Sequence, residues 1–193
     1  GAGGDVKIET GRLNLRDGSE ISAYAFNQGH GGNLTVNASN SVELIGTTPT
    51  NFIGGLFALT YADGDAGDIA INTPSLIARN GSAVSASSLG GKGNGGELTV
   101  NASELVEVSG TSRDGQYPSN LSTVSIGEMG NSGNLTVNTQ RLIVRDGAGL
   151  ATATNGEGWG GNLTVNASES VELSGVSAAG LNPTILSTDT FGQ

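Results

Sequence analysis

One short phrase recurs along the whole chain and limits what the chain can fold into. It reads Gly-Gly-Asn-Leu-Thr-Val-Asn-Ala-Ser at residues 31–39, and versions of it begin at Gly4, Gly32, Gly67, Gly96, Gly133 and Gly161. The intervals alternate between 28 or 29 residues and 35 or 37 residues. A recurring period of this size is typical of repeat architectures, in which each unit packs only on its neighbours. We therefore expect one elongated array rather than a globular domain.

Alternate repeats resemble each other most closely. The short repeats share Leu-x-x-Arg-Asp/Asn-Gly, at residues 13–18, 76–81 and 142–147. The long repeats share Asn-Ala-Ser-x-x-Val-Glu-Leu/Val, at residues 37–44, 101–108 and 166–173. The chain therefore consists of three short–long pairs. We expect a single array of six coils, with boundaries at 4–31, 32–66, 67–95, 96–132, 133–160 and 161–193.

Each repeat contains three short stretches in which apolar and polar residues alternate, as at residues 6–8, 13–15 and 21–23 of the first coil. A period of two residues indicates half-buried β-strands. The pattern predicts an all-β fold, a right-handed parallel β-helix (β-solenoid) of six three-strand coils without helices. At roughly 4.8 Å per coil the rod would be about 29 Å long, with Leu, Val and Ile columns inside.

The long repeats carry additional residues between the second and third predicted strands. These segments are 47–55, 111–120 and 176–184, and each contains a proline. We expect them to project from one edge of the rod as a row of three loops.

One strand position is occupied by asparagine in five of the six coils, namely Asn37, Asn72, Asn101, Asn138 and Asn166, with Glu9 in the first coil. Stacked amides can donate to and accept from one another along the rod, so we predict a structural ladder at this position. A second position lies between glycines before the first strand and holds His30, Asp65, Asn94, Asn131 and Trp159. That spacing predicts a tight turn with φ > 0, and the single histidine, His30, is interpreted as a turn residue.

Outward-facing charges also repeat with the coils. Glu43, Glu107 and Glu172 lie in the long coils, offset by one strand position from Arg16, Arg79 and Arg145 in the short coils. Stacking would place each glutamate diagonally between arginines. Because exposed pairs contribute only about 0–1 kcal/mol each, we interpret these charges as setting the register of short coils on long coils.

Composition excludes several classes of partner and site. The net charge is −10, and the eight Lys and Arg residues are scattered, whereas nucleic acids and anionic membranes select clustered basic residues. No apolar run is long enough for a membrane-spanning helix, so membrane insertion is not expected. There is no cysteine and only one histidine, so the chain has almost none of the residues that a Ser–His–Asp triad or a zinc site needs.

The densest carboxylate cluster is Asp63-Gly-Asp65-Ala-Gly-Asp68. Its spacing loosely resembles a calcium-binding loop, so these three aspartates are the weak metal candidates, with calcium as the ion. The equivalent segment of another coil, residues 130–134, is uncharged. The other interpretation is a turn that tolerates aspartate, and no other cofactor is expected.

The hydroxyl- and amide-rich outer face of the first strand could bind polysaccharide weakly. Aromatic residues that would stack on sugars are scattered through the sequence and do not share one column: Tyr24, Phe26, Phe52, Phe57, Tyr61, Tyr117, Trp159 and Phe191. A plain soluble β face is the alternative interpretation.

Two segments carry a family resemblance. They are residues 160–175, Gly-Gly-Asn-Leu-Thr-Val-Asn-Ala-Ser-Glu-Ser-Val-Glu-Leu-Ser-Gly, and residues 142–148, Leu-Ile-Val-Arg-Asp-Gly-Ala. With them the chain resembles the repeat region of filamentous-haemagglutinin-like bacterial exoproteins, which are β-helical and exported by two-partner secretion. The resemblance covers all six coils. It implies an extracellular or outer-surface location, an adhesive or matrix role, and no catalytic residues.

Three functions therefore remain open. The first is a non-catalytic structural and adhesive shaft of a secreted bacterial surface protein. The second is a protein that binds or processes polysaccharide, and processing would require carboxylates and a basic residue in one cleft. The third is a filament subunit, whose partners would be like chains end to end rather than neighbouring coils of a longer chain.

Overall fold

The computed structural model describes residues 1–26, 28–48 and 52–192, and the regular structure in this part of the chain is entirely β. Long and short strands alternate. The long strands are β1 (Val6–Arg16), β3 (Leu34–Ile45), β5 (Ile69–Arg79), β7 (Leu98–Ser109), β9 (Leu135–Arg145) and β11 (Leu163–Ser174). The short strands are β2 (Glu20–Ala25), β4 (Gly55–Thr60), β6 (Ala83–Ser88), β8 (Asn120–Ser125), β10 (Gly149–Thr154) and β12 (Ile185–Thr190).

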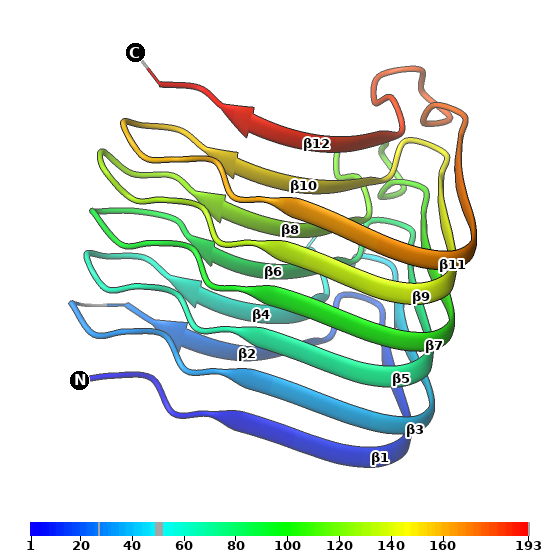
Figure 1. Cartoon of the computed structure of the whole chain (residues 1–193), viewed down its shortest axis with the longest axis horizontal. Helices are drawn as coiled ribbons and strands as arrows, with labels where there is room; N and C mark the ends of the chain where they lie inside the picture. The colour runs from blue at the N-terminus through cyan, green and yellow to red at the C-terminus, as the bar shows by residue number, and fades with distance from the viewer. Residues whose placement is uncertain (27, 49–51, 193) are drawn as a thin grey trace.

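The strands form two six-stranded sheets, one of long strands in the order β1-β3-β5-β7-β9-β11 and one of short strands in the order β2-β4-β6-β8-β10-β12. All pairings between successive strands are parallel. The chain therefore climbs by one strand of each sheet per coil, as Figure 1 shows from β1 at the bottom to β12 at the top. The predicted parallel β-solenoid is confirmed.

The first two predicted strands of each coil are continuous in the structure. They form one long strand with a register shift in its middle, between Thr10 and Arg12 where β1 pairs with β3. The long strand has 11 residues in the first coil and 12 in the second, so one of the additional residues of a long coil (12 − 11 = 1) lies at this bend. The pairing lapses at this shift and resumes on its other side, so the strand bends but stays in the sheet, as at a β-bulge.

Apolar side chains from both sheets fill the interior in columns. One column contains Leu34, Ile69, Leu98 and Leu135, and each is at most 1% exposed. The register places these residues directly on one another from coil to coil. Small and apolar residues of the short strands, such as Leu56 and Ala58, complete the same buried cluster. The core is therefore linear and grows by one layer with each coil.

The glycine that begins each repeat after the first is required by the closeness of the coils. A Cβ atom on Gly96 would lie 2.0 Å from the carbonyl oxygen of Gly67, and one on Gly133 would lie 1.9 Å from that of Gly96. The predicted φ > 0 turn concerns the preceding position, which holds His30, Asp65, Asn94, Asn131 and Trp159, and neither these residues nor the glycines beside them have positive φ angles. That prediction is wrong, because the constraint there is again steric contact between successive backbones: a Cβ atom on Gly93 would lie 2.0 Å from the carbonyl oxygen of Gly64.

Positive φ angles occur instead where a short coil passes from its long strand to its short strand. The residue pairs there are Asp17–Gly18, Asn80–Gly81 and Asp146–Gly147, with φ between 54° and 85°. Asparagine, aspartate and glycine are the residues that tolerate this left-handed conformation. The shared Arg-Asp/Asn-Gly motif of the short repeats thus specifies a tight corner.

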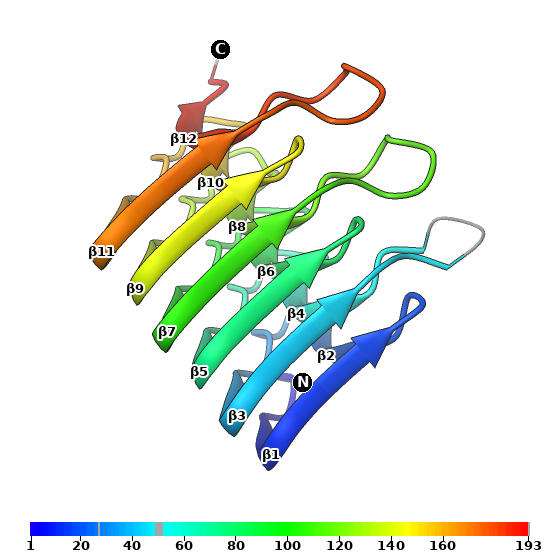
Figure 2. The ribbon, with the colours of Figure 1, turned by 90° about the vertical axis from the view of Figure 1, so that its right-hand side faces the viewer.

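The long coils carry loops at the same edge of the rod. Each loop begins and ends in an isolated antiparallel bridge: Thr47–Ile53, Thr111–Pro118 and Val176–Pro183. Figure 2 shows the long loops alternating along this edge with the tight corners of the short coils. Residues 49–51 of the first predicted loop lie outside the described residues. The second and third loops touch, since Asn182 Nδ2 donates to the carbonyl oxygen of Gly115 at 2.9 Å.

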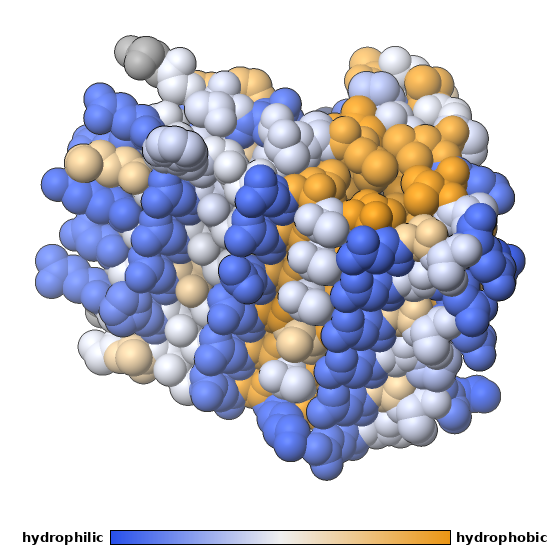
Figure 3. Space-filling model, in the orientation of Figure 1, coloured by the Kyte–Doolittle hydropathy of each residue, from blue (hydrophilic) through white to orange (hydrophobic). Residues whose placement is uncertain are grey.

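Both ends of the coil stack leave the core partly open. In the last coil Val171 and Leu173 are 46% and 44% exposed, whereas Leu142 and Val144, their partners one coil below, are fully buried. Figure 3 shows the resulting apolar patch at the upper end of the stack, over β11. At the other end Val6, Ile8, Leu13 and Leu15 are only partly buried. Each end thus exposes a layer of the kind that is buried within the rod.

Candidate functional site

The predicted asparagines form a continuous row of amide hydrogen bonds on the outside of the long-strand sheet. Each Nδ2 donates to the Oδ1 of the coil below it, from Asn72 to Asn37, Asn101 to Asn72, Asn138 to Asn101 and Asn166 to Asn138, at 2.8–2.9 Å. Glu9, the predicted exception, pairs with Lys7 at 2.8 Å. The role of this asparagine ladder is structural, because its amides bond to one another.

Replacing Asn101 by aspartate should weaken this ladder measurably. The new carboxylate could still accept from Asn138, but it could not donate to Asn72, and two acceptor oxygens would face each other. We expect the free energy of unfolding to fall by about 1–2 kcal/mol at neutral pH. The unfavourable contact raises the folded-state pKa of the new carboxyl, so the loss should shrink as the pH falls towards about 4, where the protonated group donates again.

Urea unfolding at the two pH values measures this effect. Ser103→Ala, at an exposed position two residues further along β7, is the matched control and should unfold like the unmodified protein at both. An equal loss for Asn101→Asp and Ser103→Ala, or a loss that does not change with pH, would contradict the ladder's contribution.

Two further ladders use side-chain acceptors and backbone donors. In one, Asp65 N–H donates to His30 Nδ1 at 3.2 Å, and Asn94 N–H donates to Asp65 Oδ1 at 2.8 Å. In the other, Asp68 N–H donates to Asn33 Oδ1 at 2.9 Å, and Glu97 N–H donates to Asp68 Oδ1 at 2.8 Å. The turn before each long strand is thereby tied to the turn of the next coil.

These ladders involve two of the three weak calcium candidates, Asp65 and Asp68 but not Asp63, and calcium binding stays a prediction. Asp65 and Asp68 belong to different ladders, and one oxygen of each already accepts a backbone hydrogen bond. Within the described part of the chain, no group of three or more His, Cys, Asp or Glu side chains is arranged to hold a metal ion. The arrangement agrees with the other interpretation, in which the turn tolerates aspartate.

The predicted register charges form two of the expected contacts. Arg16 lies 3.6 Å from Glu43, and Arg145 lies 2.8 Å from Glu107, each across a diagonal of adjacent strands. Arg145 also contacts Asp146, and the Glu107 carboxylate is the main cause of a raised Arg145 pKa. Among the described residues, Arg79 and Glu172 have no ionic partner within 4.0 Å. The regular alternation of charge is thus only partly realised as ion pairs.

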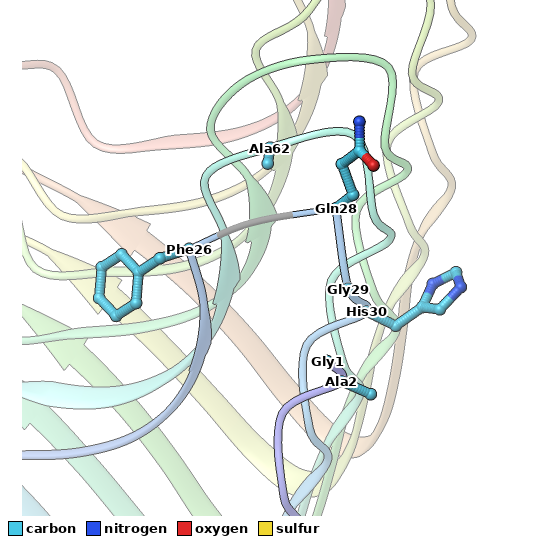
Figure 4. A pocket seen from close by; sticks show the side chains of 7 residues that line it. All are labelled: Gly1, Ala2, Phe26, Gln28, Gly29, His30 and Ala62. Atoms are coloured by element: carbon cyan, nitrogen blue, oxygen red, sulfur yellow. The ribbon is translucent and has the colours of Figure 1, made fainter.

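The open hollow beside the first turn does not look like a binding site. It is bounded by Gly1, Ala2, Phe26, Gln28 and Gly29, together with His30 and Ala62. Figure 4 shows the Phe26 ring and the His30 imidazole at opposite sides of the view, pointing away from each other. Side chains that diverge in this way cannot surround one ligand, and we set this hollow aside.

A more promising site lies on the outer face of the short-strand sheet, over the first four coils. Here the outward residues Phe57 and Leu59 of β4 are almost buried, although they face away from the core. They pack with Ala83, Tyr24 and Ile53 into a second apolar cluster. Around this cluster runs a groove of about 550 Å³, which we call the aromatic groove.

The aromatic groove has two walls and a floor. Phe52, Ile53 and Tyr117 line it from the segments that precede the short strands, and Tyr24, Tyr61 and Leu89 line it from the opposite strand ends. The outward residues of β4, β6 and β8 lie between them, with Phe57 and Leu59 followed by Ser85 and Ser122.

The rings at one wall hold one another in place. Phe26 and Tyr61 are stacked with an interplanar angle of 4° and ring centroids 5.3 Å apart. Tyr24 meets both rings edge-on, at 5.8 and 5.9 Å. Such pairs contribute about 0.5–1.5 kcal/mol beyond the area they bury. Tyr61 is therefore an exposed ring with a fixed orientation.

Polar groups lie next to these rings. Tyr24 Oη donates to Glu20 Oε2 at 3.2 Å, and Ser22 Oγ donates to Glu20 Oε1 at the same distance. Burial raises the pKa of Tyr24, and the nearby Glu20 carboxylate raises it further, so the phenol remains a donor. Further along the groove, the one hydroxyl proton of Ser122 has two acceptors within reach, Asn120 Oδ1 at 3.1 Å and Ser85 Oγ at 3.3 Å.

Sequence reasoning missed this site. It treated the aromatic residues as scattered, but the structure gathers all phenylalanine, tyrosine and tryptophan residues except Trp159 and Phe191 in or beside the groove. They come from different coils and from loops, so no single repeat position marks them. An available signal was Phe57, which is apolar and large at a strand position where the other coils carry serine or alanine.

Comparison of the chain with family models, curated proteins and solved structures finds no match. The described residues also include no helix with the length and apolar character needed to cross a bilayer. The features that bear on function are therefore the repeat architecture, the open ends and the aromatic groove.

Proposed function

We propose that this chain is a non-catalytic structural and adhesive shaft of a secreted bacterial surface protein, located outside the cell or on its outer surface. The observation that carries the proposal is that the apolar interior continues to both ends of the coil stack. Val171 and Leu173 at one end, and Val6 and Leu13 at the other, occupy columns that are fully buried in the intervening coils. Solenoids require a cap or a further repeat over such a layer.

The partners that fit these ends are other coils of the same kind, either a like chain end to end or neighbouring coils of a longer chain. The first coil is a short coil and the last is a long coil, so stacking one on the other continues the alternation. Unpaired strand edges at each end would supply the backbone donors and acceptors. Resemblance to filamentous-haemagglutinin-like exoproteins supports the secreted, adhesive part of the proposal.

End-to-end association is tested by placing a charge on one open end. Rods of the unmodified protein should lengthen as concentration rises, because stacking buries the exposed layers. Leu173→Lys should keep the rods single, since it would bury an unpaired ammonium group. Ile126→Lys changes a similarly exposed apolar residue in a middle coil and should leave association unchanged.

Sedimentation velocity over a concentration series, with negative-stain electron microscopy of the same samples, gives the rod lengths. If unmodified rods stay single at every concentration, the ends are not joints between chains. If the two lysine variants behave alike, apolar contact at the open end does not drive association.

The aromatic groove favours a second candidate function, polysaccharide binding. It favours binding over processing because glycoside hydrolysis ordinarily uses a pair of carboxylates, whereas Glu20 is the one carboxylate among the described residues that line the groove.

A further inference from the structure

We propose that the aromatic groove binds a neutral polysaccharide chain that lies along the axis of the rod across the first four coils. The inference goes beyond the shaft function and does not depend on whether the ends of the rod associate. It assigns an adhesive contact to the side of the rod, on the face opposite to the core.

The walls of the groove offer rings to the apolar faces of sugars. Tyr61 is 44% exposed and is held by Phe26 and Tyr24, and Tyr117 at the opposite wall is 38% exposed. The electron-rich face of an aromatic ring attracts the polarised C–H bonds on one side of a pyranose. Because Tyr61 is fixed before binding, little conformational entropy is lost when a sugar stacks on it.

The polar groups of the groove match the hydroxyl groups of sugars. The Glu20 carboxylate is oriented by Tyr24 and Ser22 and keeps acceptor capacity for further hydroxyl donors. Asn120, Ser85 and Ser122 supply amide and hydroxyl groups on the next coils. Apolar surface with a few oriented polar groups is the usual composition of a ligand site.

The dimensions of the groove favour a chain over a single sugar. It extends from β2 through β4 and β6 to β8, which are three steps of roughly 4.8 Å, or about 14 Å along the rod. Its volume of about 550 Å³ also exceeds the needs of one monosaccharide. A short stretch of an extended polymer fits this shape.

Charge and backbone pairing argue against other occupants. Among the described lining residues Glu20 is the only charged one, and the whole chain carries −10, so an acidic polymer would be repelled. An added peptide strand would need free backbone groups, but β4 and β6 in the floor are paired on both edges. A neutral ligand rich in hydroxyl groups remains the best match.

Native affinity electrophoresis of the 193-residue chain tests the proposal. The gels contain galactomannan, xyloglucan, hydroxyethylcellulose or dextran as neutral probes, with alginate as the acidic probe, and isothermal titration with spermine covers a cationic ligand. We expect at least one neutral polymer to retard the protein. The double variant Tyr61→Ala/Tyr117→Ala should bind it about tenfold or more weakly.

Two controls separate ring stacking from loss of structure. Tyr61→Phe keeps the ring and should retain most of the binding, whereas Trp159→Ala removes a ring that is 82% exposed away from the groove and should have no effect. All variants are first compared by circular dichroism and thermal melting. Retardation by alginate alone, binding of spermine alone, or retardation by none of the neutral polymers would overturn the proposal. So would neutral-polymer binding that survives the double alanine change in a folded protein.

Discussion

Replacing Gly96 by alanine is expected to destabilise the protein by more than about 3 kcal/mol or to prevent folding. The new Cβ would lie 2.0 Å from the carbonyl oxygen of Gly67, which real Cβ atoms cannot approach. The contacting atom belongs to the backbone, so relief would require the two coils to separate. Separation would stretch the adjacent hydrogen bond from Ile69 N–H to the Glu97 carbonyl oxygen, which is 2.8 Å long.

Gly4 provides the matched control for this experiment. It occupies the same repeat position in the first coil, has no positive φ angle, and a Cβ added there meets nothing within 4 Å. Gly4→Ala should therefore unfold within about 0.5 kcal/mol of the unmodified protein. The two variants are compared by urea unfolding followed by circular dichroism. Equal losses of stability in Gly96→Ala and Gly4→Ala would contradict the steric contact between coils.

The second large effect is expected at the apolar column. Leu98 is completely buried between Ile69 and Leu135, so Leu98→Ala should lower the free energy of unfolding by about 2–5 kcal/mol. Leu163→Ala makes the same change in the last coil, where the side chain is only partly buried, and should lose clearly less. The two variants are compared by the same urea titration.

Equal losses at Leu98 and Leu163 would mean that the last coil is covered in solution. Repeating the titration at several protein concentrations distinguishes cover by another molecule, because stability would then increase with concentration. The comparison of Leu98→Ala with Leu163→Ala thus measures how much core packing stabilises the protein and whether the open end of the core is covered.

The repeat pattern was sufficient to predict the backbone architecture. Alternation at residues 6–8, 13–15 and 21–23 located the inward residues, and the parallel pairing of equivalent coils followed from the period. The pattern did not predict that the first two stretches would merge into one bent strand. The two stretches join at residues 10–12, where the pairing register shifts and hydropathy carries no signal.

The glycine positions were identified from the sequence, but their physical reason was not. A single sequence does not distinguish a glycine that is required for a positive φ angle from one that is required for close contact between backbones. Only the distance between Gly96 and Gly67 in successive coils separates the two explanations. The positive φ angles belong instead to residues such as Asp17 and Gly18, at the corner that the short repeats share.

The aromatic groove could not be predicted from repeat positions because no single position marks its residues. Phe57 lies at a position that the other coils fill with serine or alanine, whereas Tyr61 shares its position with Phe26 and Phe191, and three different coils contribute the lining rings. Regular positions specify a rod, whereas binding surfaces on a rod arise from the irregular ones. Residues that break a repeat are therefore the first candidates for function in such a chain.

The alternation of long loops with tight corners also determines how such a rod can change in length. Loops on successive coils would lie about 4.8 Å apart, which is too close for two neighbouring loops that each fold back on themselves. Loops on every second coil lie about 9.6 Å apart. The contact between Asn182 and Gly115 shows that even this wider spacing is filled. A gene duplication that inserted one long coil would force two loops into the same space, while insertion of a short–long pair would not. The pair is therefore the smallest heritable module, and a designer who wishes to lengthen or shorten the rod should add or remove 63 to 66 residues at a time.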